Sequence, residues 1–161
     1  MSTKQATGRM KGGLGLSGAA RREMEPNAPP EDCVFCKILS GKEPAYVVYE
    51  DAENQAFLDN MPFNQGHTLI VPKRHVVGLI DLEGEERHSF ITAVANVCRM
   101  VEERISPHYN IACNRGEPAG QVVFHLHFHV IPRFGEGREV FSRRLRLTER
   151  EFREVQKKLR G

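Results

Sequence analysis

Three histidines alternate with apolar residues in the C-terminal half of the chain. His125, His127 and His129 are separated by Leu126 and Phe128. Successive side chains of a β-strand point to opposite faces, so a strand would place the three imidazoles on one face, about 6.5 to 7 Å apart. Imidazole titrates near pH 7 and can act as a nucleophile, a general base or a metal ligand. The spacing therefore predicts a reactive or metal-binding face more strongly than three structural histidines.

Two cysteines, Cys33 and Cys36, have the Cys-x-x-Cys spacing of metal ligands. A redox pair would need a preceding strand and a helix N-terminus, whereas a proline-rich segment precedes these cysteines; a pair of unligated cysteines is the remaining alternative. Cys98 and Cys113 stand alone, so the four cysteines do not form the framework of a disulfide-rich protein. This usage favours a reducing compartment, and we expect a cytoplasmic protein.

Short apolar segments between turns must position these side chains. A compact apolar segment at 33–40, followed by Gly41, predicts a short N-terminal helix. Alternation and turn residues predict five strands, at 46–49, 55–59, 68–71, 109–113 and 121–131. The expected fold is α+β: an antiparallel five-stranded sheet with this short helix, one long helix and a C-terminal helix.

Two further helices follow from apolar spacing and caps. Apolar residues within 90–105 recur at helical intervals and predict the long helix, with Asp81 as its N-cap and Pro107 beyond its end. Thr148 and Glu151 form a capping box at the start of the C-terminal helix. Its narrow apolar stripe would pack on this subunit or on a partner: Phe152, Val155 and Leu159.

The length of 161 residues suits one domain with some chain to spare, and the composition, 40% apolar and 27% charged, is typical of soluble proteins. No apolar run approaches the length needed to cross a bilayer. We expect a flexible extension at 1–31, a domain at 32–135 and a C-terminal extension at 136–161. Residues 23–132 carry eight basic and sixteen acidic residues between two basic ends, which disfavours a nucleic-acid-binding body.

Three segments of the chain resemble the histidine triad (HIT) superfamily, in its Hint-like branch. The most specific is GQVVFHLHFHVIPR at 120–133, which contains the family pattern His-φ-His-φ-His-φ-φ, where φ is apolar. The segments AFLDNMPFNQGHTLIVPKRH at 56–75 and CVFCKI at 33–38 are similar to the same family, in the same order. The resemblance covers about residues 32–133 and implies nucleotide hydrolases and transferases that act as homodimers.

The resemblance implies a two-step reaction at the α-phosphate of a nucleotide. His127 would attack phosphorus, the leaving group would depart, and water would hydrolyse the resulting nucleotidyl-histidine. A backbone carbonyl would hold the other nitrogen of His127, and His129 would contact phosphate oxygens or the leaving group. The implied substrates are nucleoside phosphoramidates, nucleotidyl esters and dinucleoside polyphosphates.

The resemblance also implies roles for other residues. His75 and His125 match the positions that complete a Cys2His2 zinc site with Cys33 and Cys36, and such a closed site would be structural. The implied nucleotide-binding residues are Asp59 at the ribose, Asn60 at the base, and Asn114, Gly120 and Gln121 near the phosphate.

Two kinds of position fall outside this pattern. Val122 stands where relatives often have serine or threonine, which removes one hydroxyl near the scissile bond. His67 and His108 lie outside the triad, and we interpret both as structural or surface residues.

Three other functions remain open from the residues. The three histidines could hold one catalytic metal in a metal-dependent hydrolase. The chain could instead be a non-catalytic nucleotide-binding or scaffold protein. Deadenylation of nucleic-acid ends is a further alternative, but the chain has no C-terminal zinc-finger pattern.

Overall fold

The computed structural model describes residues 32–135 and 143–161. The N-terminal extension expected at 1–31 lies outside the described residues, as do the first residues of the C-terminal extension, 136–142. The described elements, in chain order, are α2 (Val34–Leu39), β1 (Val47–Glu50), β2 (Asn54–Leu58), β3 (Thr68–Pro72), a 3-10 turn (Leu79–Asp81), α3 (Gly84–Arg104), β4 (Tyr109–Ala112), a second 3-10 turn (Glu117–Ala119), β5 (Phe128–Pro132) and α4 (Glu149–Arg160).

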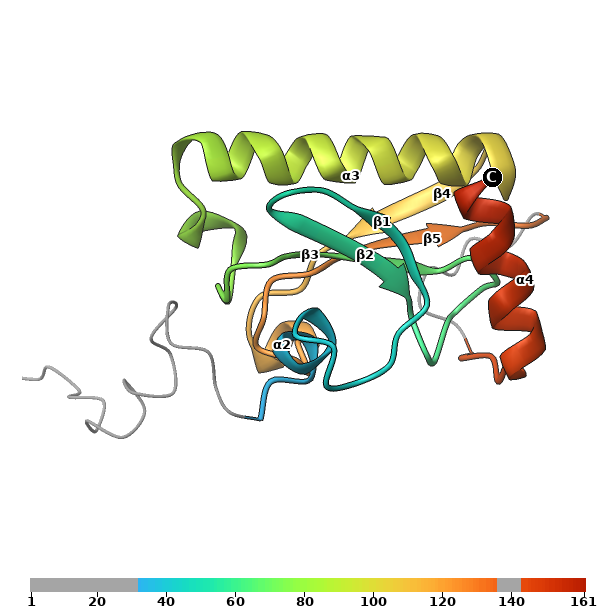
Figure 1. Ribbon diagram of the computed structural model, residues 1–161, viewed down its shortest axis with the longest axis horizontal. Helices are drawn as coiled ribbons and strands as arrows, with labels where there is room; N and C mark the ends of the chain where they lie inside the picture. Colours follow the sequence, from blue (N-terminus) through green and yellow to red (C-terminus); the bar gives the residue numbers. More distant parts are fainter. Residues whose placement is uncertain (1–31, 136–142) are drawn as a thin grey trace, which may run out of the picture.

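The five strands form one antiparallel sheet in the order β1-β2-β3-β5-β4, which confirms the predicted α+β fold (Figure 1). The hairpin of β2 and β3 lies at its centre, with Leu58 opposite Thr68 and Asn54 opposite Pro72. Residues of β5 pair with both β3 and β4, so the strand that carries His129 is an interior strand. Its backbone is therefore fixed from both sides.

Helices cover both faces of this sheet (Figure 1), and the strand residues alternate between them. Ala56, Ile70 and Val130 belong to the core beneath α3, whereas Phe57 and Leu69 pack in a smaller cluster with α2. Every residue of β2 and β3 is buried for this reason. The face beneath α3 is the main hydrophobic core, and the opposite face is the one on which histidines and cysteines gather.

The last strand is shorter than the sequence predicts. β5 begins at Phe128, whereas the alternation predicts a strand from Gln121. Pairing between β3 and β5 ends with Ile70 opposite Phe128. Two residues further along β3 comes Pro72, which has no N–H to continue the ladder. Alternation over a strand at 121–131 would place Phe124 on the core face with Leu126 and Phe128, but Phe124 is 40% exposed.

The helix caps match the prediction at α4 and differ at α3. Thr148 and Glu151 form the expected capping box. Asp81 does not cap α3: its carboxylate accepts a hydrogen bond from the N–H of Gly78 in the preceding 3-10 turn, and Glu83 occupies the N-cap position. The stripe of α4 packs on this subunit, where Phe152, Val155 and Leu159 join the core beneath α3.

Across the two described ranges, the structure contains no helix of the length and apolarity that a bilayer crossing requires.

Candidate active site and metal centre

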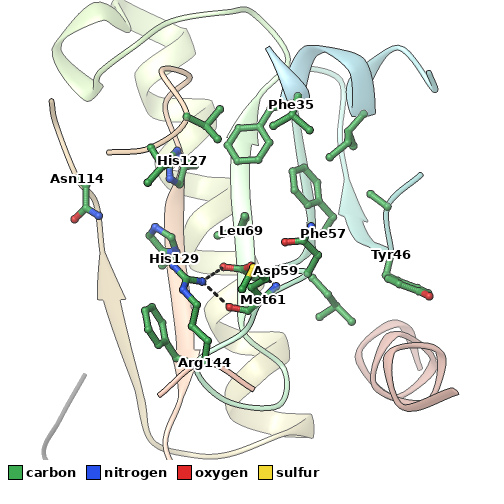
Figure 2. A pocket seen from close by; sticks show the side chains of 18 of the residues that line it. Phe35, Tyr46, Phe57, Asp59, Met61, Leu69, Asn114, His127, His129 and Arg144 are labelled. Carbon is green, nitrogen blue, oxygen red and sulfur yellow. Dashed lines mark hydrogen bonds and ion pairs between the residues drawn. The ribbon is translucent and has the colours of Figure 1, made fainter. Parts of the chain in front are cut away.

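A cavity of about 680 Å³ opens on the α2 face of the sheet, within the usual size range of ligand pockets. Phe35, Phe57 and Leu69 form much of its apolar wall, and His127 and His129 lie on the opposite side (Figure 2). Six of the predicted site residues line this cavity: Asp59, Asn60, Asn114, Gly120, His127 and His129. The fold therefore brings most of the predicted nucleotide-site residues together.

His127 is held in one tautomer by the main chain. Its Nδ1 lies 2.7 Å from the carbonyl oxygen of His125, and a carbonyl can only accept, so Nδ1–H is the donor. The lone pair of His127 is then on Nε2. Phe35 packs edge-on against this imidazole, with ring centroids 5.2 Å apart. Burial lowers the pKa of His127, which keeps the ring neutral and nucleophilic near pH 7.

His129 takes part in a buried chain of hydrogen bonds. The N–H of Phe63 donates to Nδ1 of His67 at 3.2 Å, so the proton of the neutral His67 ring is on Nε2. Nε2 of His67 lies 2.9 Å from Nδ1 of His129 and donates to it. This assigns the proton of His129 to Nε2, leaving that N–H as its remaining donor. His129 lines the cavity, and its ring centroid lies 4.9 Å from that of His127.

Burial is the main cause of the low basicity of these two rings. It lowers the pKa of His67 to about 4 and that of His129 to about 3. The neighbouring imidazoles and the Arg144 charge lower the pKa of His129 further. Both rings are neutral near pH 7, so each can accept a hydrogen bond at Nδ1 and donate one from Nε2 without adding a positive charge to the cavity.

The Asp59 carboxylate lies at the edge of the cavity near His129 (Figure 2). Its Oδ1 accepts from the N–H of Met61 at 2.8 Å. Its Oδ2 lies 3.5 Å from Nδ1 of His67 and 3.6 Å from Nη1 of Arg144. The carboxylate is nearly buried, with 9% of its side chain exposed, and the groups that orient it are the Met61 N–H and the Arg144 guanidinium, because Nδ1 of His67 carries no proton in the tautomer assigned above.

The turn before the histidines is braced by Gln121. Its Nε2 donates to the carbonyl of Val77 at 2.9 Å, and its Oε1 accepts from the N–H of Gly116 at 2.8 Å. Gln121 is buried and does not line the cavity, so the structure places it behind the turn, away from the ligand position the resemblance implies. Gly120 has a φ of +85°, which favours glycine. Asn114 lines the cavity while its Nδ2 donates to the Gly120 carbonyl at 3.3 Å.

Four residues form a second cluster beside the cavity. The ligand atoms of Cys33, Cys36, His75 and His125 all lie within 4.8 Å of one another. The sulfur of Cys36 is 3.2 Å from Nδ1 of His75, and both sulfurs are 3.6 Å from Nδ1 of His125. Neither cysteine forms a disulfide. The cluster joins α2 to the residues that follow β3 and precede β5.

The donor set and its spacing fit zinc. Zn–S and Zn–N bonds of about 2.3 and 2.05 Å at tetrahedral angles place sulfur and nitrogen about 3.6 Å apart, close to the distances found here. Nε2 of His125 donates to the carbonyl of Pro72 at 2.8 Å, which leaves Nδ1 unprotonated and directed at the sulfurs. Burial and the neighbouring Cys33 raise the pKa of Cys36 to about 12, so a bound cation would be needed to hold this thiolate.

Two residues of the site were not predicted. The sequence suggests a structural or surface role for His67, and the structure shows a buried histidine bonded to His129. Its position two residues before Leu69, on the same face of the hairpin, was a usable signal. Arg144 lines the cavity and gave no signal, because it lies in the C-terminal extension without a motif around it.

Comparisons with known proteins agree with this geometry. The family model described as "HIT domain" matches residues 40–136. An uncharacterised HIT-like protein from Methanocaldococcus jannaschii is 46% identical over 109 residues, covering 67% of this chain and 84% of its own. An adenylylsulfatase from Arabidopsis thaliana is 37% identical over 124 residues, covering 74% of this chain and 60% of its own.

One similar protein of known structure is bound to zinc. The zinc-bound histidine triad family protein from Mycobacterium smegmatis is 40% identical, with a TM-score of 0.69, covering 80% of this chain and 91% of its own. Sequence, fold and the clustered histidines thus agree, and the chain belongs to the HIT domain family.

Proposed function

We propose that this chain hydrolyses or transfers nucleotides at the α-phosphate through a covalent nucleotidyl-His127 intermediate. The observation that carries the proposal is the hydrogen bond from Nδ1–H of His127 to the carbonyl of His125, at 2.7 Å. It leaves Nε2 of a neutral imidazole as the nucleophile, in a ring that lines the cavity.

The reaction takes two displacements at phosphorus. In the first, Nε2 of His127 forms a bond to phosphorus, and the leaving group departs with the electron pair of its own bond, taking a proton from solvent where it is an amine. The histidine becomes a cation, which the carbonyl of His125 stabilises through Nδ1–H. In the second, water bonds to phosphorus, loses a proton to solvent and releases the neutral imidazole and a nucleoside monophosphate. The Nε2–H of His129 donates a hydrogen bond to a phosphate oxygen in both steps.

The remaining cavity residues would bind the nucleoside. The Asp59 carboxylate would accept hydrogen bonds from ribose hydroxyls, and Asn60 would contact the base. Asn114 and the Gly120 backbone would lie at the phosphate. Gln121 would act indirectly, by holding the turn through Gly116 and Val77.

The substrate class follows from what the cavity must recognise. A nucleoside with an activated α-phosphate offers a phosphorus atom to His127, ribose hydroxyls to Asp59 and a flat base to the apolar wall. We propose phosphoramidates, nucleotidyl esters including nucleotidyl sulfates, and dinucleoside polyphosphates; the relative named as an adenylylsulfatase supports the inclusion of sulfates. Val122 is 85% exposed and offers no hydroxyl to the leaving group, so departure would depend on the leaving group's own acidity.

Zinc would be held by Cys33, Cys36, His75 and His125. Four protein ligands leave no open position, so the metal would cross-link α2 to the sheet and stabilise the backbone around His127. The alternative of a catalytic metal held by all three triad histidines lacks support, because their Nδ1 atoms have three different partners: the cysteine sulfurs, a carbonyl and His67.

We also propose a cytoplasmic homodimer. β4 is an edge strand of the sheet, and it exposes half of Ile111, while α3 exposes Ile91. Apolar side chains on an edge strand and a neighbouring helix favour contact with a second copy. Light scattering after gel filtration would give the mass, and a monomer at micromolar concentration would contradict this part of the proposal.

Trapping the intermediate tests the function directly. The protein is mixed with adenosine 5′-phosphoramidate, quenched in alkali, digested and analysed by mass spectrometry. We expect an adenylyl group on the peptide containing His127 and none in His127→Asn. Turnover without a detectable adduct, abolished by chelation, would instead support metal-dependent hydrolysis. Micromolar nucleotide binding without turnover would support a binding protein.

A further inference from the structure

Arg144 lies at the wall of the cavity although it falls beyond residues 40–136, the part that the family model matches. We propose that Arg144 is a positioning residue for ribose recognition, which holds the Asp59 carboxylate where it can accept hydrogen bonds from the ribose hydroxyls. This inference rests on the proposed function, in which Asp59 binds the ribose. It adds a role for the C-terminal extension in selecting ribonucleotides.

The contacts of Asp59 leave room for a diol. Met61 donates to Oδ1, while Arg144 and His67 lie beside Oδ2. A carboxylate has about four lone-pair positions, so each oxygen keeps acceptor capacity after these contacts. Two oxygens in a fixed orientation suit two neighbouring hydroxyls. Without Arg144, the Met61 N–H would be the one remaining donor among the described residues that holds the carboxylate, and Oδ2 would lose its cation.

Arg144 is itself held in place by the loop that follows Asp59. Its guanidinium donates to the carbonyl of Met61 (Figure 2). The guanidinium also lies over the Phe63 ring, 4.4 Å from the centroid. The next residue, Leu145, donates its N–H to the carbonyl of Pro62 at 2.7 Å. Main-chain and side-chain contacts therefore fix this part of the extension against the 61–63 loop.

The helix that follows anchors the extension from the other side. Phe152 of α4 is buried in the core and stacks on Tyr46, with centroids 4.9 Å apart and an interplanar angle of 10°. Tyr46 lines the same cavity. The extension is thus fixed on both sides of the short segment 145–151, and the guanidinium position follows from the fold.

The pair differs from an ordinary surface salt bridge. Arg144 is 43% exposed, but the Asp59 side chain is only 9% exposed. Exposed pairs contribute little, whereas a nearly buried carboxylate that loses its cation keeps an uncompensated charge. Among the described residues that line the cavity, Arg144 carries the only guanidinium or ammonium group. A lysine would supply charge without the planar stacking on Phe63.

Calorimetric titrations of the full chain with two nucleotides test the proposal. Adenosine 5′-monophosphate has both ribose hydroxyls, and its 2′,3′-dideoxy analogue has neither. We expect the unmodified chain to prefer the ribonucleotide. Arg144→Gln should weaken ribonucleotide binding about tenfold and dideoxynucleotide binding less than about twofold, since a hydrogen bond to a charged group contributes on this scale. Arg146→Gln is the matched control, since Arg146 is an exposed arginine two residues away, and should behave as the unmodified chain.

The opposite results would overturn the proposal. Equal weakening of both nucleotides by Arg144→Gln would mean that the guanidinium acts on the phosphate, and no weakening would mean that it positions nothing. Asp59→Asn separates the inference from the proposed function. Loss of the ribose preference in Asp59→Asn with its retention in Arg144→Gln overturns the role of Arg144 alone. A chain without any ribose preference overturns both.

Turnover gives a second readout that a purely structural role would not produce. Arg144→Gln should raise KM for a ribonucleotide phosphoramidate with kcat changed less than about twofold, because His127 is untouched. Arg144→Lys should restore part of the ribose preference. A fall in kcat with an unchanged KM would contradict a positioning role at the ribose.

Discussion

Helices lie on both faces of the sheet, but the two faces are built from different residues. Beneath α3 lies a continuous core of aliphatic and aromatic side chains, such as Phe90, Ile70 and Val130. Beneath α2 the apolar cluster is small, and beside it lie the cysteine and histidine cluster and the cavity. The same strands supply both faces, since adjacent residues point in opposite directions.

This difference shows how the fold separates stability from chemistry. A tightly packed face can hold β5 in register without leaving space for a ligand. The α2 face then carries buried polar groups that would be costly without partners, and each described histidine there has one. We expect changes on one face to affect stability and changes on the other to affect turnover or metal content.

The largest expected effect is on turnover, from the α2 face. His127→Asn should reduce kcat at least about a thousandfold, because the nucleophile is removed while the fold is kept. The measurement is steady-state hydrolysis of adenosine 5′-phosphoramidate, with circular dichroism to show that the variant is folded. A variant that retains a tenth of the activity would refute the covalent mechanism.

The matching change on the α3 face is Phe90→Ala. This ring is fully buried and packs edge-on against Phe128 at 5.3 Å, so its loss should lower the free energy of unfolding by about 3 to 5 kcal/mol. Urea denaturation measures the loss, and kcat per folded molecule should be unchanged. A fall in kcat with no loss of stability would break the proposed separation of the two faces.

Zinc content sharpens the comparison, because the metal would stabilise the α2 face in place of a large core. The purified chain should hold one zinc per molecule by elemental analysis. Cys36→Ser should hold none and unfold more than about 5 °C lower, whereas Cys113→Ser, an exposed cysteine, should match the unmodified chain. Equal zinc content in both variants would exclude the Cys2His2 site.

The smallest expected effect is the dependence of stability on pH. Burial holds the pKa of His67 at about 4, below its ordinary value of about 6.5 in an unfolded chain. The unfolded state therefore binds more protons between these values, so the contribution of His67 is complete above pH 6.5 and falls as pH decreases toward 4. His67→Gln should flatten this part of the stability profile, while His88→Gln, at an exposed position of α3, should not. Parallel profiles for both would contradict the assignment.

Much of the site could be predicted because many of its reactive residues lie close together in the sequence. The Cys33–Cys36 pair and the three alternating histidines each occur within five residues or fewer, and alternation correctly separated His129 from Val130. The strand around His125 could not be delimited, because Pro72 ends the ladder from a different segment. His67 and Arg144 depend on contacts across the fold that no local pattern encodes.

The charge pattern needs a similar correction. Residues 23–132 have an excess of acidic residues and both ends of the chain are basic, but this pattern assigned no site residue to either end. Arg144 comes from the basic C-terminal end and reaches the cavity beside Asp59. Net charge summed over a segment cannot reveal which single side chain crosses to another segment.

The N–H of Phe63 makes the proton pattern of the cavity independent of side-chain identity at that position. Because this main-chain group donates to His67, it determines which nitrogen of His67 donates to His129, and so which nitrogen of His129 carries the proton. Nineteen of the twenty amino acids supply the same N–H, and only proline lacks it. Substitutions at residue 63 can therefore change the cavity wall, while the backbone N–H at this position still determines which nitrogens of His67 and His129 carry protons.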